Sequence, residues 1–119
     1  MMKFLMSAAI AGVFVGMTST AEARSLYDGS WDLRFVTQRG TCDASQEFTV
    51  NINDGVITHP NLVRFKGYVA HSGAVRASVT VQDKYASGSG KLSNNTGRGT
   101  WRGSSGTARC SGYWTAQRH

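Results

Sequence analysis

Residues 110–118 alternate between two kinds of side chain. A β-strand points successive side chains to opposite faces, so this segment would have one small or apolar face around an indole and one polar face. Residues 28–35 have the same pattern, with Trp31, Leu33 and Phe35 on the apolar face. The apolar face of the last segment holds Cys110, Gly112, Trp114, Ala116 and Arg118. We predict that the two segments are neighbouring strands that close a small barrel.

Six more alternating segments lie between these two, at about residues 46–53, 56–58, 62–70, 75–81, 85–92 and 97–103. Turn residues separate them, the clearest being Asp54-Gly55, which suits a tight hairpin, and Pro60, which cannot donate to a strand ladder. No segment after residue 23 has the period of an amphipathic helix. The chain is therefore predicted to be all-β: a small antiparallel up-and-down β-barrel of about eight strands, with a β-sandwich as the alternative.

The segment from residue 85 to residue 103 is rich in glycine and serine, as flexible tails often are. The alternation continues through it, however, and places Gly88, Gly90 and Gly99 on the same face as Trp101. Glycines on the inner face of a small barrel leave room for neighbouring indoles and allow the sheet to coil tightly. We therefore expect strands here.

The first 23 residues have the features of a cleaved export signal: Lys3, an apolar run over residues 4–17, and an Ala-x-Ala site at residues 21–23. The apolar run is shorter than a membrane-spanning helix, although a short membrane anchor is the alternative. Cleavage would leave residues 24–119 as a single domain with no transmembrane segment. We expect a monomer that is periplasmic or secreted.

The chain has two cysteines, Cys42 and Cys110. In an oxidising compartment they are predicted to form one disulfide, which would tie the end of the first strand region to the last strand. The alternative is a pair of free thiols. A metal site is not expected, because the cysteines have no CxxC spacing.

The formal net charge is +6, and loss of residues 1–23 removes one basic and one acidic residue. The basic residues are dispersed along the sequence, which favours a role in solubility over a polyanion site. If the charge is functional, an envelope glycan or lipid is the expected anionic partner, because export argues against nucleic acid. The residues concerned face outward: Arg34, Arg64, Lys66, Tyr68, Arg76, Arg98, Arg102 and Tyr113.

Motifs of catalysis are absent from the sequence: there is no Gly-x-Ser-x-Gly elbow, His-Glu-x-x-His pair or phosphate loop. His59 and His71 fall in predicted turns, and His119 ends the chain. Their spacing predicts no metal or haem site, although His59 and His71 would be the first candidates for a haem. We predict a protein that is not an enzyme and has no cofactor.

A Gly-x-Trp unit occurs at residues 29–31, 99–101 and 112–114. The first resembles the opening motif of the calycin barrels, a group that includes lipocalins, avidins and small periplasmic metalloprotease inhibitors. The resemblance implies that a tryptophan on the first strand packs under a basic side chain from the last strand. Trp31 and Arg118 match these two roles, and an arginine over an indole is a favourable cation–π contact.

Most of the mature chain also resembles a group of small exported proteins of alphaproteobacteria. The shared pattern is an Asp-Gly-x-Trp start, a mid-chain cysteine and a Cys-x-Gly-x-Trp-x-Ala-x-Arg end. In this sequence it falls on residues 28–31, Cys42 and residues 110–118.

These observations predict a non-enzymatic exported binding protein for a small apolar ligand or an anionic cell-envelope component. Its ligand pocket would be lined by Trp31, Phe65, Trp101 and Trp114, although large aromatic side chains also dominate small cores. The alternative is an interaction protein that inhibits an exported hydrolase through loops at residues 38–45 or 59–62.

Overall fold

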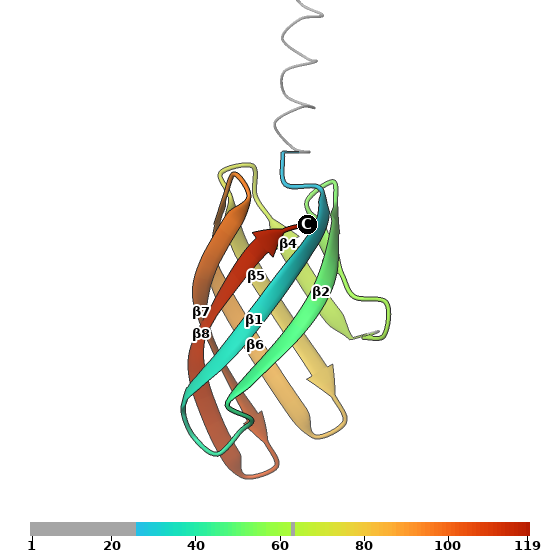
Figure 1. The fold of residues 1–119 in the computed structure, drawn as a ribbon. Coiled ribbons are helices and arrows are strands. Elements are labelled where there is room, and N and C mark those ends of the chain that lie inside the picture. Colours follow the sequence, from blue (N-terminus) through green and yellow to red (C-terminus); the bar gives the residue numbers. More distant parts are fainter. Residues whose placement is uncertain (1–25, 63) are drawn as a thin grey trace, which may run out of the picture.

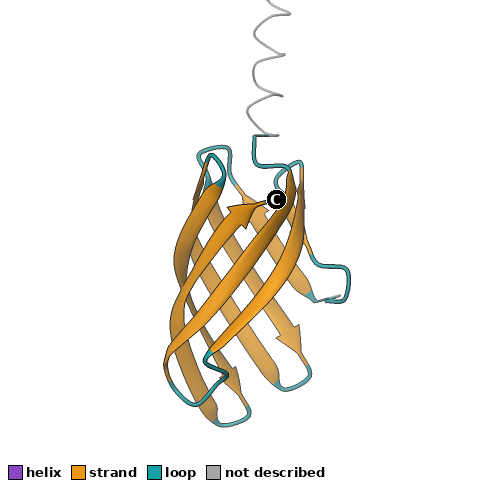
Figure 2. Cartoon of the chain, in the orientation of Figure 1, coloured by secondary structure: helices purple, strands orange, loops and turns teal. Residues whose placement is uncertain are grey.

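The computed structural model describes residues 26–62 and 64–119, which form a closed barrel of eight antiparallel strands (Figure 1). The predicted signal peptide (residues 1–23) and Val63 lie outside the described residues. Each strand pairs with the next, and β8 pairs with β1. The strands are β1 (Gly29–Arg39), β2 (Ser45–Asn53), β3 (Val56–Thr58), β4 (Phe65–Val69), β5 (Ala74–Val81), β6 (Lys84–Ser93), β7 (Thr96–Ser105) and β8 (Ala108–Arg118). The prediction of an all-β barrel is confirmed, and the sandwich alternative is wrong; short turns join the strands (Figure 2).

The pairing of β1 with β8 closes the barrel, as the sequence pattern predicted. Trp31 lies opposite Arg118, and Phe35 lies opposite Trp114. The loop predicted at residues 38–45 begins later than expected, because β1 continues to Arg39. A shift in register after Thr37 absorbs one residue, as a β-bulge does, so the strand can continue.

The turns form where the sequence predicts turn residues, and one strand, β4, is shorter than predicted. Asp54 and Gly55 have φ angles of 51° and 80°, which fit the tight β2–β3 hairpin. Strand β4 begins at Phe65 rather than at about residue 62. The chain after Pro60 is a turn instead, in which the Leu62 N–H donates to the His59 carbonyl at 3.3 Å.

The two ends of the barrel differ in how deeply the inward side chains are buried. At the end where β1 begins and β8 finishes, Trp31 is 1% exposed and Leu92 is 3% exposed. Along the inner face of β5, exposure rises from 7% at Val75 to 42% at Val81, near the opposite end. We call these the closed end and the open end; they are the upper and lower ends in Figure 1.

Glycines shape the wall around Trp114, as the sequence predicted. A Cβ atom on Gly90 would lie 2.5 Å from the Trp114 ring, and one on Gly99 would lie 2.6 Å from it. Both distances are below van der Waals contact, so any larger residue would push the indole inward. The glycine-rich strands β6 and β7 therefore make room for a large core side chain.

A disulfide joins Cys42, in the β1–β2 loop, to Cys110 in β8 across a Cα–Cα distance of 6.2 Å. The prediction of this bond is confirmed. Because 68 residues separate the two cysteines, the chain-entropy model gives roughly 4 kcal/mol of stabilisation. The bond fastens the open end, where little of the core lies.

Within residues 26–62 and 64–119, no helix is long and apolar enough to cross a membrane.

Candidate ligand cavity

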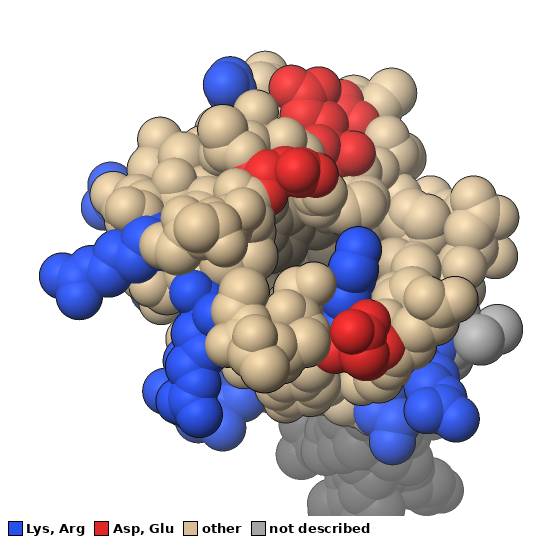
Figure 3. Space-filling model, turned by 90° about the horizontal axis from the view of Figure 1, so that it is seen from below, with Lys and Arg blue, Asp and Glu red and all other residues tan. Residues whose placement is uncertain are grey.

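The barrel interior contains two adjoining hollows. The inner cavity has a volume of about 70 Å³, and the outer cavity, at the open end, has a volume of about 510 Å³. Viewed from the open end, the molecule is hollowed at its centre (Figure 3). The two cavities share the wall residues Leu33, Phe35, Val50, Phe65, Val79, Ala86 and Trp101. Together they form one cup that deepens toward the closed end.

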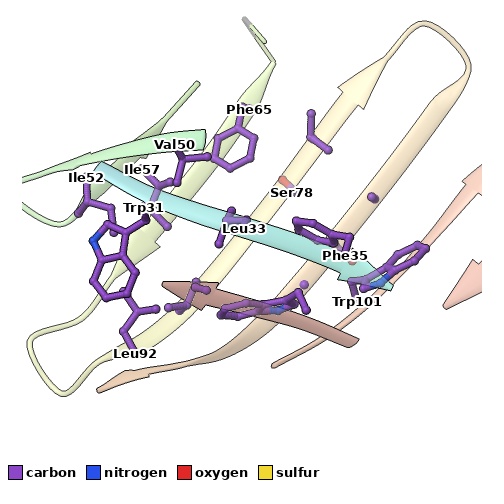
Figure 4. A pocket seen from close by; sticks show the side chains of 18 residues that line it. Trp31, Leu33, Phe35, Val50, Ile52, Ile57, Phe65, Ser78, Leu92 and Trp101 are labelled. Carbon is purple, nitrogen blue, oxygen red and sulfur yellow. The ribbon is translucent and has the colours of Figure 1, made fainter. Parts of the chain in front are cut away.

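The four residues predicted to line a pocket all border the inner cavity, but at different depths. Trp31 and Trp114 belong to the packed core, at 1% and 4% exposure. Phe65 and Trp101 are only partly buried, and both also border the outer cavity. In Figure 4, Trp31 lies toward one end of the cavity and Trp101 toward the other. Two of the four predicted residues thus lie nearer the open end than the other two.

All three indole N–H groups already have backbone carbonyl acceptors. Trp31 donates to the Tyr27 carbonyl at 2.8 Å, and Trp101 donates to the Val36 carbonyl at 3.1 Å. Trp114 donates to the Ser89 carbonyl at 3.2 Å. Because these bonds satisfy the indoles internally, the tryptophans offer the cavity only their apolar ring surfaces.

A chain of edge-to-face aromatic contacts forms one side of the outer cavity. Phe35 contacts Phe48 with a centroid separation of 5.8 Å and Trp101 with a separation of 6.2 Å. Phe48 in turn contacts the His59 ring at 6.0 Å. Phe35 lies on the predicted apolar face of residues 28–35, and Phe48 lies in the strand predicted at residues 46–53, but neither was predicted to be a site residue. The available signal was their position: both are inward residues close to the open end of their strands.

The rim of the outer cavity is polar, in contrast to its walls. Thr37 donates to the Asp43 backbone carbonyl at 2.6 Å, and Gln46 donates to the Asp43 carboxylate at 3.0 Å. Lys84 also borders the outer cavity, and within the described residues its side chain has no hydrogen bond or ion pair. The His59 Nδ1 accepts the Asn61 N–H at 3.1 Å, which leaves Nε2 to carry the proton of the neutral ring.

The closed end is sealed by Arg118. Its guanidinium carbon lies 4.7 Å from the centroid of the Trp31 ring, in the arrangement that the calycin resemblance implied. The same guanidinium donates to the Asp28 carbonyl at 2.6 Å and to the Leu26 carbonyl at 2.8 Å. It also bonds the Asn94 carbonyl at 3.0 Å and the Asn95 side chain at 3.1 Å. Four partners fix this side chain over the indole at the closed end.

The two histidines named as haem candidates lie on loops at opposite ends of β4. His59 borders the outer cavity, while His71 lies in the exposed β4–β5 turn at the closed end. His119 contacts Asp32 at 3.0 Å on the outer surface. In the described part of the chain, no three His, Cys, Asp or Glu side chains are grouped so that they could hold a metal ion.

The two loops predicted to contact a partner protein both reach the open end. The first contributes Thr41, Cys42 and Asp43 to the wall of the outer cavity, and the second contributes His59 and Leu62. They therefore flank the same opening.

Comparison of the chain with protein-family models, curated proteins and solved structures finds no match.

Proposed function

We propose that the protein is a non-enzymatic binding protein that holds a small apolar ligand in its barrel. The observation that carries this proposal is the outer cavity of about 510 Å³, whose walls are largely aliphatic and aromatic. Pockets for small molecules have volumes of roughly 300–1,000 Å³ and are lined mainly by apolar side chains with a few polar groups. The charged and amide side chains lie at the rim, and only Ser78 and Ser87 add polar side chains to the lining of the inner cavity.

The ligand would enter through the open end with its most apolar part first. The indole N–H groups of Trp31, Trp101 and Trp114 are bonded to backbone carbonyls, so these three side chains supply dispersion and hydrophobic contact only. Any polar group of the ligand would remain near Gln46 and Lys84 at the rim. Phe65 and Trp101 would form the wall that first contacts it.

The disulfide supports a location outside the cytoplasm, because such bonds persist in oxidising compartments. We propose that the protein acts in the periplasm or after secretion. A carrier there would keep a poorly soluble molecule out of water.

The test is the binding of a neutral apolar dye, N-phenylnaphthylamine, to the wild-type protein and to Ala86→Phe. Ala86 borders both cavities, so a phenyl ring there would fill the cup. We expect saturable dye fluorescence with the wild type and an affinity at least about tenfold weaker, a cost of about 1.4 kcal/mol, with the variant.

The matched control is Ala74→Phe, which makes the same change at an exposed position on β5. It should bind the dye like the wild type, and circular dichroism should show both variants folded. Equal binding by a folded Ala86→Phe variant, or no dye binding by the wild type, would reject the carrier proposal.

A second proposal is that the open end binds an exported protein such as a hydrolase. It is favoured by the convergence of the loops at residues 38–45 and 59–62 on one opening, with the first loop fastened by the disulfide. For this function, changes to exposed loop residues such as Thr41 should abolish partner binding, while Ala86→Phe should leave it intact.

A further inference from the structure

The net charge of the protein comes entirely from its last three strands. Residues 1–83 contain seven basic and seven acidic residues, which cancel. Residues 84–119 contain six Lys and Arg and no Asp or Glu, so they carry the whole formal charge of +6. Strands β6, β7 and β8 are neighbours in the barrel, so this charge lies on one continuous section of its wall.

Four of these six basic side chains face outward and are exposed. They are Lys91, Arg98, Arg102 and Arg109, which we call the basic wall. Within the described residues, none of these four has a side-chain hydrogen bond or an ion pair. The other two have different positions: Arg118 covers the closed end, and Lys84 borders the outer cavity. Basic side chains project from several sides of the barrel in the view from the open end (Figure 3).

The strand register brings like charges together on this wall. Lys91 lies directly opposite Arg98, and such cross-strand partners have Cβ atoms about 4.5–5.5 Å apart. Arg98 is opposite Thr115, which is opposite Arg34 on β1, so three cations lie in one row across the barrel. Like charges in this arrangement destabilise a sheet. Glu47 on β2 lies opposite Arg34, but no acidic residue on β6, β7 or β8 relieves Lys91 and Arg98. An external anion would do so.

The residues between the cations suit an anionic surface. Arg102 is flanked by Ser87 and Ser111, whose short side chains leave its guanidinium accessible. Tyr113, on the same outer face of β8, is 39% exposed. Tyrosine is enriched where proteins meet the membrane–water interface, because its ring is apolar and its hydroxyl is polar.

We propose that the basic wall docks the protein onto an anionic lipid surface through lipid phosphate groups. Lipids move laterally and can match the fixed spacing of the four cations, whereas the exposed tyrosine favours an interface over a fully solvated polymer. A second reason rests on the proposed function: a carrier of apolar molecules would exchange them at a membrane. The basic residues are dispersed along the sequence because turns separate them. The strand register nevertheless brings the four residues of the basic wall onto one section of the barrel.

The test is sedimentation of the protein with vesicles of pure phosphatidylglycerol and of pure phosphatidylcholine. We expect binding to the first only, and release as salt shortens the screening length to about 3 Å at 1 M. Each basic residue near such a surface contributes about fivefold to binding, so Arg98→Gln with Arg102→Gln should weaken it about 25-fold.

The matched control removes the same charge with Arg64→Gln, just before β4, and Lys66→Gln in β4, a strand that β5 and β6 separate from β7. This pair should weaken binding by less than about threefold, because charges farther away than about 10 Å are largely screened at 0.1 M salt. Equal losses in the two double variants would overturn the assignment to the basic wall. Wild-type binding to phosphatidylcholine as strong as to phosphatidylglycerol would also overturn it, as would tighter binding to heparin or DNA at the same salt.

The dye assay separates this proposal from the carrier proposal. Ala86→Phe should lose the dye and still bind vesicles, and Arg98→Gln with Arg102→Gln should do the reverse. A wild type that binds vesicles but no dye would reject the carrier and leave the docking surface supported.

Discussion

The closed and open ends of this barrel use the same alternating strands in different ways. At the closed end, Trp31, Leu92 and their neighbours pack into a core, and Arg118 seals it with bonds to three carbonyls and one side chain. At the open end, inward residues such as Val81 line a cavity of about 510 Å³. A disulfide and a polar rim stabilise that end instead of buried side chains.

The difference shows how one small barrel can be both stable and hollow. Apolar burial is concentrated at one end, where each side chain removed would leave an unfilled space. The other end keeps its apolar walls uncovered and relies on a covalent cross-link, which acts on the unfolded chain and needs no packed interior. The following substitutions test this division, in order of decreasing effect.

Trp31→Ala should have the largest effect on stability. It removes the largest fully buried side chain, and such truncations cost about 3–5 kcal/mol of unfolding free energy. Urea unfolding followed by far-UV circular dichroism measures it. Trp101→Ala, at the partly buried open side, should cost less than half as much; equal costs would contradict the division into a packed end and a hollow end.

Replacing both cysteines, with Cys42→Ser and Cys110→Ser, should cost about 2–4 kcal/mol. The physical reason is the greater conformational freedom of the unfolded chain when the 68-residue link is lost. Thermal unfolding of the oxidised protein, the reduced protein and the double variant checks this. The reduced protein and the variant should agree, and a variant as stable as the oxidised protein would show that the open end is held by packing.

Arg118→Met should cost about 1–3 kcal/mol, because it removes the bonds to the Asp28, Leu26 and Asn94 carbonyls and the stacking on Trp31. Arg98→Met is the control, since its exposed side chain has no partner within the described residues and should change stability by at most about 0.5 kcal/mol. Chemical unfolding measures both. Similar values for the two variants would mean that Arg118 is not a seal.

Val81→Ala should have the smallest effect, at most about 0.5 kcal/mol, because the side chain is already 42% exposed. Val75→Ala makes the same change on the same face of β5, at 7% exposure, and should cost about 2 kcal/mol. Because both variants make the same substitution, a difference in their unfolding free energies reflects position along the barrel and not residue type. A larger loss at Val81 than at Val75 would reverse the comparison.

Much of the fold could be predicted because alternation and turn chemistry are local. The period of two identified the eight strands and their inward faces, and Asp54-Gly55 identified a hairpin from two residues. The errors concern strand ends whose positions depend on pairing with distant parts of the chain. Strand β1 continues through a bulge against β8, and β4 starts only after the turn at Pro60 is complete.

The candidate site was predicted only in part. The sequence placed Trp31, Phe65, Trp101 and Trp114 inward but could not rank them by depth. It did not identify Phe35 and Phe48 as site residues, because an inward residue near a strand end has the same sequence pattern whether that end of the barrel is packed or open. The distinction depends on which side chains from all eight strands meet at one level of the barrel.

By itself, the sequence determined the all-β class, the inward and outward face of each strand, and the single disulfide pairing, since each depends on local periodicity or on having only two cysteines. The tertiary structure decided the rest. Closure sets which inward side chains share a layer, and hence where space remains between them. Strand register decides which outward charges become neighbours, so residues as far apart in sequence as Arg34 and Arg98 lie in one row.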